Sequence, residues 1–304
     1  MKSVATNHFP RVRFEKNQKW LYNPVLKKRF KDRPEERVRL RWVDYLLLET
    51  SWKKTRIGFE TPLNIRQEPG KLRADLLLYS DSMKPQILIE CKSDSVPLNT
   101  TTAEQAARYN QEVGAKWLIL TNGVVDYTFQ IADGKPQKAE NPVQAGQENT
   151  MRDFAYWSER GFCSGQMSKE LRSRITPFLN NFWNHEPDWQ TKYLPFQTSW
   201  LHFSMSHYYR IIQTEDQKKL AVTIMGHGHF GTYLTAVLNE KRENRGVLII
   251  DLEKSIKDSK KSARLISANQ EVFFSALPIL EEFFPKSGIN QIKKLPEHLI
   301  RLFD

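Results

Sequence analysis

The sequence contains only two cysteines, Cys91 and Cys163, among 304 residues. Two thiols are too few for a disulfide framework or for a zinc site with four thiolate ligands. No run of about 18 apolar residues occurs, which argues against a membrane-spanning helix. Residues 1–8 also lack the apolar core of a secretory signal. We therefore expect a reduced, cytoplasmic protein that does not contact a membrane.

Acidic residues are also few relative to basic ones. The chain has 46 Lys and Arg against 35 Asp and Glu, a net charge of +11. Residues 1–60 hold 16 basic and 7 acidic side chains, so most of the excess lies in one fifth of the chain. Aromatic residues, such as Trp20 and Tyr22, are interleaved with these cations. Because cations neutralise phosphates and aromatic rings stack on bases, this pattern favours nucleic-acid binding. A solvated basic surface without a partner is the alternative.

The chain length predicts about two domains. Residues 1–33 are polar and basic and are predicted to form an irregular arm. Residues 34–131 are predicted to form the first domain. The polar segment 132–150, which contains Pro and Gly, is predicted to be a linker. Residues 151–304 are expected to form an α+β domain of unknown role, with strands at 220–225, 232–238 and 247–252 and helices at 270–284 and 289–303.

The first domain should begin with a helix at Pro34, because Pro suits the first helical turn and Asp32 can cap it. Glu36 shares a helix face with Leu40 and Val43, so it places a carboxylate in line with the buried stripe. The elements expected after this helix are strands at 63–67, 73–79 and 86–92, a helix at 102–113 ended by Gly114, and strands at 117–120 and 125–129. This order predicts an α/β fold with a mixed sheet flanked by helices.

Asp75, Glu90 and Lys92 are the predicted catalytic residues. Glu90 and Lys92 are two residues apart in a strand, so their side chains leave the same face. Antiparallel pairing with the preceding strand would bring Asp75 opposite Glu90. Carboxylate oxygens on a rigid sheet suit Mg²⁺ or Mn²⁺, which polarises a phosphate and activates a bound water. Lys92 could position that water, or accept its proton if burial lowers its pKa. A surface ion pair at a strand end is the alternative.

Five short motifs occur in order within residues 30–130. They are Pro34-Glu35-Glu36-Arg37-Val38-Arg39, Arg73-Ala74-Asp75, Ile89-Glu90-Cys91-Lys92, Gln105-Ala106-Ala107-Arg108-Tyr109 and Leu120-Thr121-Asn122-Gly123. Together they resemble the N-terminal nuclease domain of type I restriction enzyme restriction subunits, a member of the PD-(D/E)xK nuclease superfamily. The resemblance implies a restriction-endonuclease-like core and Mg²⁺-dependent cleavage of DNA.

The resemblance also implies roles for particular residues. Asp75, Glu90 and Lys92 would be the catalytic set, with Glu36 as the helix carboxylate and Glu35 as a less favoured candidate. The implied metal ligands are Asp75, Glu90 and Glu36. Gln105 and Tyr109 match the family's Gln-x-x-x-Tyr motif and would help to organise the site. Separately from the resemblance, Lys27, Lys28 and Arg29 of the basic arm are expected to contact DNA, and Arg73 is expected to organise the site or to contact DNA.

The sequence departs from the family in two respects. Ala74 replaces the Pro of the superfamily motif, a position that only shapes the strand. No G-x-x-x-x-G-K-[ST] phosphate loop occurs, so the sequence gives no support for an ATP-driven motor. The leading hypothesis is a metal-dependent DNA endonuclease that acts alone or with protein partners encoded elsewhere. Cutting both strands needs two sites, which a homodimer would supply. The alternatives are a non-catalytic nucleic-acid-binding module of the same fold and a regulatory protein whose basic arm binds an acidic partner.

Overall fold

The computed structural model of the chain divides into two compact units, residues 1–150 and 151–304. Each unit is described separately. The residues that the structure describes are 1–16, 18–62, 73–143, 145–146, 152–184, 188–196, 205–214, 217–226, 231–257, 259–267, 269–285 and 291–303. The strand predicted at 63–67 lies outside these residues.

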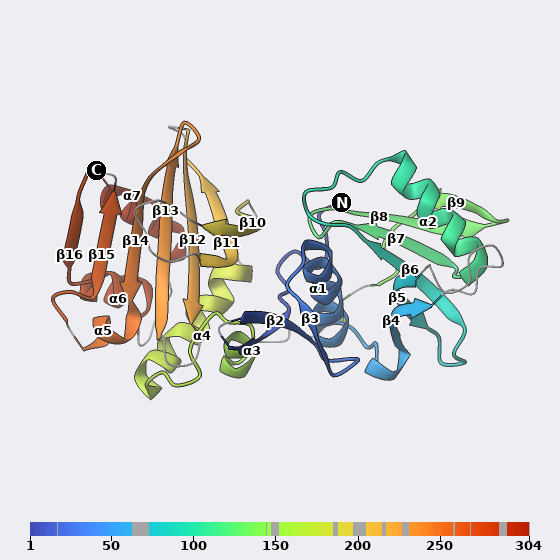
Figure 1. The fold of residues 1–304 in the computed structure, drawn as a ribbon, viewed down its shortest axis with the longest axis horizontal. Helices are drawn as coiled ribbons and strands as arrows, with labels where there is room; N and C mark the ends of the chain where they lie inside the picture. Colours follow the sequence, from blue (N-terminus) through green and yellow to red (C-terminus); the bar gives the residue numbers. More distant parts are fainter. Residues whose placement is uncertain are drawn as a thin grey trace. The chain divides into compact units, whose positions relative to one another are not determined.

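A six-stranded mixed sheet forms the centre of the first unit, with strand order β4-β5-β6-β7-β8-β9 (Figure 1). The strands are β4 (Ile57–Pro62), β5 (Arg73–Tyr79), β6 (Pro85–Cys91), β7 (Trp117–Thr121), β8 (Asp126–Ala132) and β9 (Lys135–Lys138), with a short 3-10 turn η1 (Lys54–Arg56) before β4. Only β6 and β7 pair in parallel, and helix α2 connects them. The predicted mixed sheet is therefore confirmed.

Helix α1 (Pro34–Glu49) begins at the predicted proline. The predicted cap is wrong, because Arg33 occupies the N-cap without a side-chain bond. Asp32 instead accepts a hydrogen bond from Arg37 at 2.6 Å. Glu36, Leu40 and Val43 are buried as expected, but so are residues on the other sides of the helix. Helix α1 is therefore an internal element packed between two layers.

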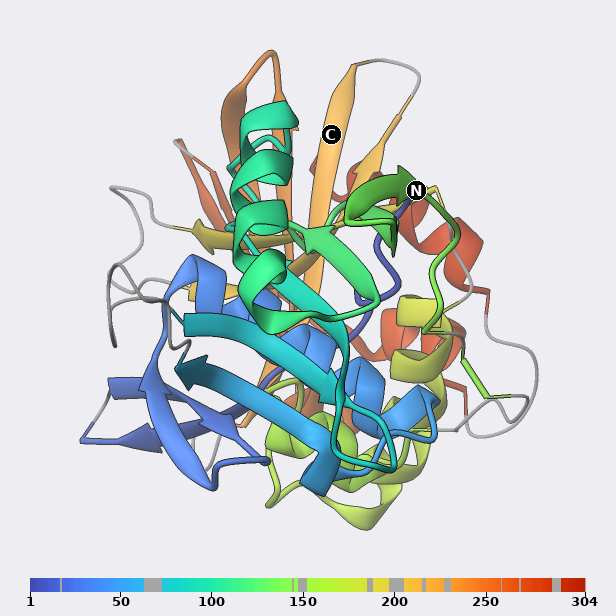
Figure 2. The same cartoon turned by 90° about the vertical axis from the view of Figure 1, so that its right-hand side faces the viewer.

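Helix α2 (Thr100–Val113) covers the opposite face of the six-stranded sheet from α1 (Figure 2). Asn99 caps its first turn by accepting a hydrogen bond from the Thr102 amide at 3.0 Å. Gly114 ends it with a φ of 69°, as predicted, because glycine adopts left-handed backbone without a steric penalty. Ala106 packs against Leu88 and Leu118, which fixes α2 over β6 and β7.

The prediction of an irregular arm at residues 1–33 is wrong. This segment contains a three-stranded antiparallel sheet of β1 (Arg11–Glu15), β2 (Gln18–Asn23) and β3 (Lys28–Lys31). Val12 and Leu21 join the same apolar core as α1, whereas most of the charged residues of the strands face solvent. The amide of Ser3 also donates to the Val124 carbonyl at 2.9 Å. The basic segment is thus an integral layer of the first unit.

The predicted linker at 132–150 also carries structure that belongs to the first unit. It includes the end of β8 and all of β9. Val143 is buried in the core, and its carbonyl accepts a hydrogen bond from the Tyr45 hydroxyl at 3.1 Å. The polar residues of β9 therefore belong to an exposed edge strand of the sheet.

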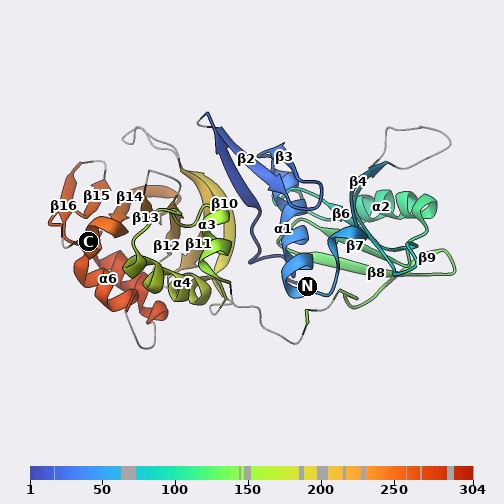
Figure 3. The same cartoon turned by 90° about the horizontal axis from the view of Figure 1, so that it is seen from below.

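The second unit is a seven-stranded antiparallel meander with helices over one face (Figures 1 and 3). Its strands are β10 (Gln190–Phe196), β11 (Met205–Gln213), β12 (Lys218–Gly226), β13 (Thr232–Glu240), β14 (Glu243–Asp251), β15 (Ala263–Ser267) and β16 (Glu271–Phe274). Its helices are α3 (Phe154–Glu159), α4 (Lys169–Asn184), α5 (Leu252–Ile256), α6 (Leu277–Phe283), η3 (Ile292–Lys294) and α7 (Leu295–Arg301).

The three strands predicted in the second unit are confirmed: 220–225 lies within β12, 232–238 is the first part of β13, and 247–252 covers the end of β14 and the first residue of α5. The helix predicted at 270–284 is wrong over its first turn, where β16 pairs with β15, and only α6 is helical. Of the helix predicted at 289–303, the first two residues lie outside the described residues, and the described part consists of η3 followed by α7. In the described part of the chain, no helix is long and apolar enough to cross a bilayer.

Candidate active site

Asp75 and Glu90 come from neighbouring strands of the first unit. Strands β5 and β6 pair antiparallel with Leu76 opposite Ile89, so the next position along each strand brings Asp75 opposite Glu90. The backbone amide of Cys91 donates to Asp75 Oδ2 at 2.8 Å. The predicted hairpin geometry is confirmed, and the hydrogen bond fixes the Asp75 carboxylate at the end of the sheet.

Glu90 and Lys92 leave the same face of the chain at the end of β6, as predicted. Lys92 Nζ lies 2.8 Å from Glu90 Oε1. The Glu90 side chain is 8% exposed and that of Lys92 is 23% exposed, so the pair is only partly open to solvent. Cys91 points to the opposite face and packs in the apolar core. A partly buried pair of this kind differs from the ordinary surface ion pair that the sequence left as an alternative.

Arg39 is the cation at the centre of the carboxylates. Its Nη2 lies 3.0 Å from Asp75 Oδ1, and its Nη1 lies 3.0 Å from both Glu36 Oε2 and Glu60 Oε1. The Arg39 side chain is 12% exposed, and its guanidinium lies over the Phe59 ring at 5.3 Å. We call these four residues, Arg39 with Glu36, Glu60 and Asp75, the Arg39 cluster.

Glu60 reaches this cluster through an unusual backbone conformation. Its φ is +48°, a left-handed value in the middle of β4. Its neighbours Phe59 and Thr61 pair with residues on either side of Asp75. Left-handed backbone at a residue other than glycine costs about 1–3 kcal/mol and is concentrated at functional sites. The distortion places the Glu60 carboxylate beside the Arg39 guanidinium.

Burial raises the pKa values of both strand carboxyls. For Asp75, burial outweighs the opposing effects of Arg39 and of the Cys91 amide. For Glu90, burial and the nearby Asp75 charge outweigh the lowering effect of Lys92. Both groups therefore bind a proton more readily than carboxyls in water.

The pKa of Lys92 is raised, which corrects one of its two expected roles. Burial alone lowers it, but the charge and hydrogen bond of Glu90 together with the charge of Asp75 reverse the shift. Lys92 is therefore held as an ammonium group. It can donate hydrogen bonds and supply positive charge, but it is a poor proton acceptor.

Glu36 and Glu35 face the site differently. Burial raises the pKa of Glu36 to about 7, and its Oε1 is buried with no hydrogen-bond partner. Glu35 is exposed, yet its charge raises the pKa values of both Asp75 and Lys92. The helix therefore directs two carboxylates toward the site from adjacent positions, the exposed one acting on Lys92 as well as on Asp75.

The donor chemistry of the site suits a hard divalent cation. Asp75 and Glu90 supply carboxylate oxygens, and the buried, unpartnered Oε1 of Glu36 is a further oxygen without a proton donor. Among the described residues no three His, Cys, Asp or Glu side chains are grouped as a metal site. Arg39 and Lys92 instead bind the carboxylate oxygens that a metal would use. The carboxylate oxygens of this site thus match the ligand preference of a divalent cation, and some of them are in contact with Arg39 and Lys92.

The remaining predicted site residues are spread over the unit. On α2, Gln105 Nε2 donates to the Tyr109 hydroxyl at 2.8 Å, which confirms that the two share a helix face. The Arg73 side chain is 58% exposed and lies 3.8 Å from Glu60. Lys27 and Lys28 are exposed at the β2–β3 turn.

Arg29 is less free than its two neighbours at the β2–β3 turn. It is exposed in β3, where it forms an ion pair with Glu15 and lies 5.7 Å from the Trp20 ring. At the turn itself, the exposed cations are therefore Lys27 and Lys28.

Sequence reasoning missed Arg39 and Glu60 as site residues. Helical periodicity assigned Arg39 to a different face from Glu36, but a side chain three residues further along reaches back to the same turn. A signal was present, because Glu36 and Arg39 have the spacing of a helical ion pair. Glu60 gave no such signal, since its left-handed backbone depends on the folded sheet.

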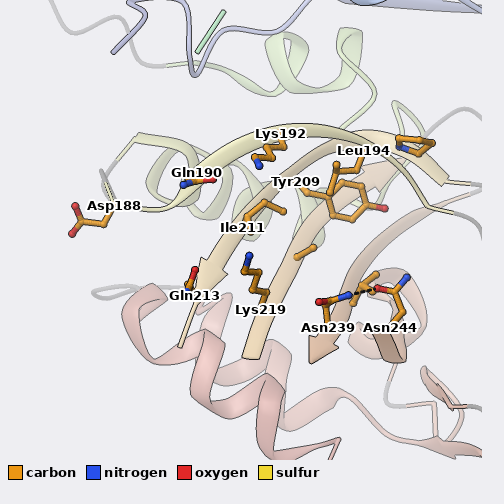
Figure 4. A pocket seen from close by; sticks show the side chains of 13 residues that line it. Asp188, Gln190, Lys192, Leu194, Tyr209, Ile211, Gln213, Lys219, Asn239 and Asn244 are labelled. Carbon is orange, nitrogen blue, oxygen red and sulfur yellow. Dashed lines mark hydrogen bonds between the residues drawn. The ribbon is translucent and has the colours of Figure 1, made fainter. Parts of the chain in front are cut away.

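The second unit has a cavity of about 370 Å³ on its seven-stranded sheet (Figure 4). Its lining residues come from the start of β10 through β14 and are Asp188, Gln190, Lys192, Leu194, Pro195, Tyr209, Ile211, Gln213, Lys219, Ala221, Val237, Asn239 and Asn244. Amide side chains, two lysines and one carboxylate surround an apolar floor. The lining holds a single carboxylate, Asp188, so it differs from the carboxylate-rich site in the first unit.

The first unit is an α/β domain with a mixed sheet, a helix on each face, and two acids and a lysine at its strand ends. Residues 34–145 match the family model of the type I restriction enzyme R protein N terminus. The resemblance carried by the five motifs is therefore confirmed over this stretch. The family indicates a nuclease-like role for the domain. No curated protein matches the chain.

Proposed function

We propose that the first unit is a metal-dependent DNA endonuclease that hydrolyses phosphodiester bonds. The observation that carries the proposal is the meeting of Asp75, Glu90 and Lys92 at one end of the sheet. Their partial burial and raised pKa values support a functional site over a surface ion pair. The match to the restriction-enzyme family supports DNA as the substrate.

In this proposal the carboxylates of Asp75, Glu90 and Glu36 hold Mg²⁺ or Mn²⁺. The bound ion would polarise the phosphate and lower the pKa of a water. Lys92, held as an ammonium by Glu90, orients the attacking water and stabilises the negative charge that develops on the phosphate. Water adds to phosphorus as the bond to the leaving oxygen breaks, and the water's proton passes to solvent. Gln105 and Tyr109 are assigned to organising the site.

The test is plasmid nicking in Mg²⁺ or Mn²⁺, with DNA affinity measured in parallel. Asp75→Asn and Lys92→Ala should each lower the nicking rate by at least about 100-fold, because each removes a charged group from the reaction centre. DNA affinity should change by less than about threefold. Asp81→Asn and Lys84→Ala, in the β5–β6 turn, are matched controls and should nick at the wild-type rate.

Nicking at the wild-type rate by Asp75→Asn would contradict the assignment of the site. The second candidate function is a non-catalytic nucleic-acid-binding module, which the basic β1–β3 sheet favours. It predicts metal-independent DNA binding without nicking by the wild-type protein.

A further inference from the structure

We propose that Arg39 is an internal cation that competes with the divalent metal for Asp75 and Glu36. The proposal rests on the function proposed above. Metal binding then requires an exchange in which the guanidinium leaves Asp75 and stays bound to Glu60. Arg39 is on this view a positioning residue that sets the metal affinity of the site.

The contacts of Arg39 are those of a bound cation. Its two terminal nitrogens lie 3.0 Å from oxygens of three carboxylates that come from α1, β4 and β5. Asp75 is bound at both oxygens, by Arg39 and by the Cys91 amide. The guanidinium thus takes up one lone-pair position of Asp75 Oδ1 and places a positive charge beside it, which opposes the approach of a metal ion to that oxygen.

Glu60 provides the second position for the guanidinium. It binds the same Nη1 atom as Glu36, and its side chain is 32% exposed, so it lies nearer solvent than the other carboxylates of the Arg39 cluster. The left-handed backbone at Glu60 directs the carboxylate toward Arg39 at an energetic cost. The Phe59 ring beneath the guanidinium supports it in this region.

Simple electrostatics gives the direction of the effect. A positive charge in contact with a metal ligand lowers the affinity of that ligand for a cation, and it does so strongly in a partly buried site. Removing Arg39 should therefore tighten metal binding. A purely structural role predicts the opposite, because loss of the ion pairs would disorder the ligands and weaken binding.

The experiment measures the binding of Mn²⁺ alone to the full chain at pH 8, with free Mn²⁺ determined by electron paramagnetic resonance. Arg39→Met should lower the dissociation constant for Mn²⁺ about tenfold relative to the wild type. Because this variant leaves two buried carboxylates unpaired, Arg39→Met/Glu36→Gln is compared with Glu36→Gln as a second pair. Arg37→Met, which removes a cation two residues away on α1, is the matched control and should change the constant by less than twofold.

A double-mutant cycle tests the role of Glu60. Glu60→Gln should weaken Mn²⁺ binding severalfold in the wild-type background and have little effect when Arg39 is Met, because Glu60 acts through the guanidinium. An unchanged or weaker affinity in both folded Arg39→Met comparisons would overturn the proposal. The proposed function would survive that result if nicking still required Asp75. Conversely, tighter Mn²⁺ binding by the Arg39→Met variants together with no nicking by the wild-type protein would uphold the exchange and reject the nuclease.

Discussion

Glu36 and Arg39 lie one turn apart on helix α1, and both side chains are largely buried. Removing one partner of a buried ion pair is more costly than removing both, because the remaining charge is left without compensation. Glu36 retains one oxygen without a partner even in the presence of Arg39. The pKa of Glu36 is therefore sensitive to the charges around it.

Glu36 should make the stability of the protein depend on pH. Burial raises its pKa from 4.5 to about 7, so the folded state binds this proton more tightly than the unfolded state. The stabilisation is present below about pH 4.5 and is lost as the pH rises through about 7. The free energy of unfolding in urea should fall less for Glu36→Gln than for the wild type as the pH rises from about 4.5 to about 7. Glu112→Gln, which removes an exposed carboxyl on α2, should follow the wild-type profile, and a parallel profile for Glu36→Gln would contradict the prediction.

The predicted catalytic residues illustrate how far the sequence reaches at this scale. The strand-end pattern around Glu90 and Lys92 and the hairpin to Asp75 are local features, and the structure confirms their pairing. The sign of the Lys92 pKa shift was not predictable, because it depends on the balance between burial and two carboxylates at folded distances. Arg39 was missed because two of its partners, Glu60 and Asp75, come from strands β4 and β5, which only the folded structure brings to helix α1.

At the scale of elements, the β1–β3 sheet gives the basic N-terminal segment a defined structure. Val12 and Leu21 anchor it to the core, while the β2–β3 turn presents cations to solvent. Lys27 has a φ of +53° at this turn, and Lys28 begins β3. Strands this short, in a run of charged residues, carry too few apolar positions for alternation to be recognised in the sequence. The longer, apolar β5 and β6 were predicted almost to the residue.

The β2–β3 turn should contribute to DNA affinity through phosphate contacts. The double variant Lys27→Glu/Lys28→Glu is expected to weaken binding and to reduce the slope of log affinity against log salt by about 1–2. Lys53→Glu/Lys54→Glu, with the same charge change at η1, is the matched control. Fluorescence anisotropy titrations at several salt concentrations would measure both. An unchanged slope in the Lys27/Lys28 variant would remove this turn from the interface.

At the scale of the whole molecule, the stretch that matches the family does not coincide with a folding unit. The match begins at residue 34, whereas the compact unit spans residues 1–150. Phe9, Val12 and Leu21 lie before the match and are buried. Each such side chain contributes about 1.5–3 kcal/mol when fully buried, against a total stability of about 5–15 kcal/mol for a typical domain.

The fragment 1–150 should therefore unfold cooperatively on heating, whereas the fragment 34–150 should not. Circular dichroism melting curves of the two fragments, with 151–304 as a reference for the second unit, would measure this. A cooperative transition for 34–150 at the temperature of the longer fragment would show that the N-terminal sheet is dispensable. Only three strands and two helices of the second unit were predicted, because its sequence contains no motif that assigns it to a known fold.

The left-handed residue in the middle of β4 has a consequence for how the protein tolerates change. Glycine would occupy position 60 without the steric penalty that glutamate incurs there. Variants selected for heat resistance should therefore accumulate glycine at this position, and they would keep the fold while the guanidinium lost its alternative partner. Under the exchange proposed here, selection for thermal stability would favour glycine at position 60, whereas selection for metal binding and DNA cleavage would favour glutamate.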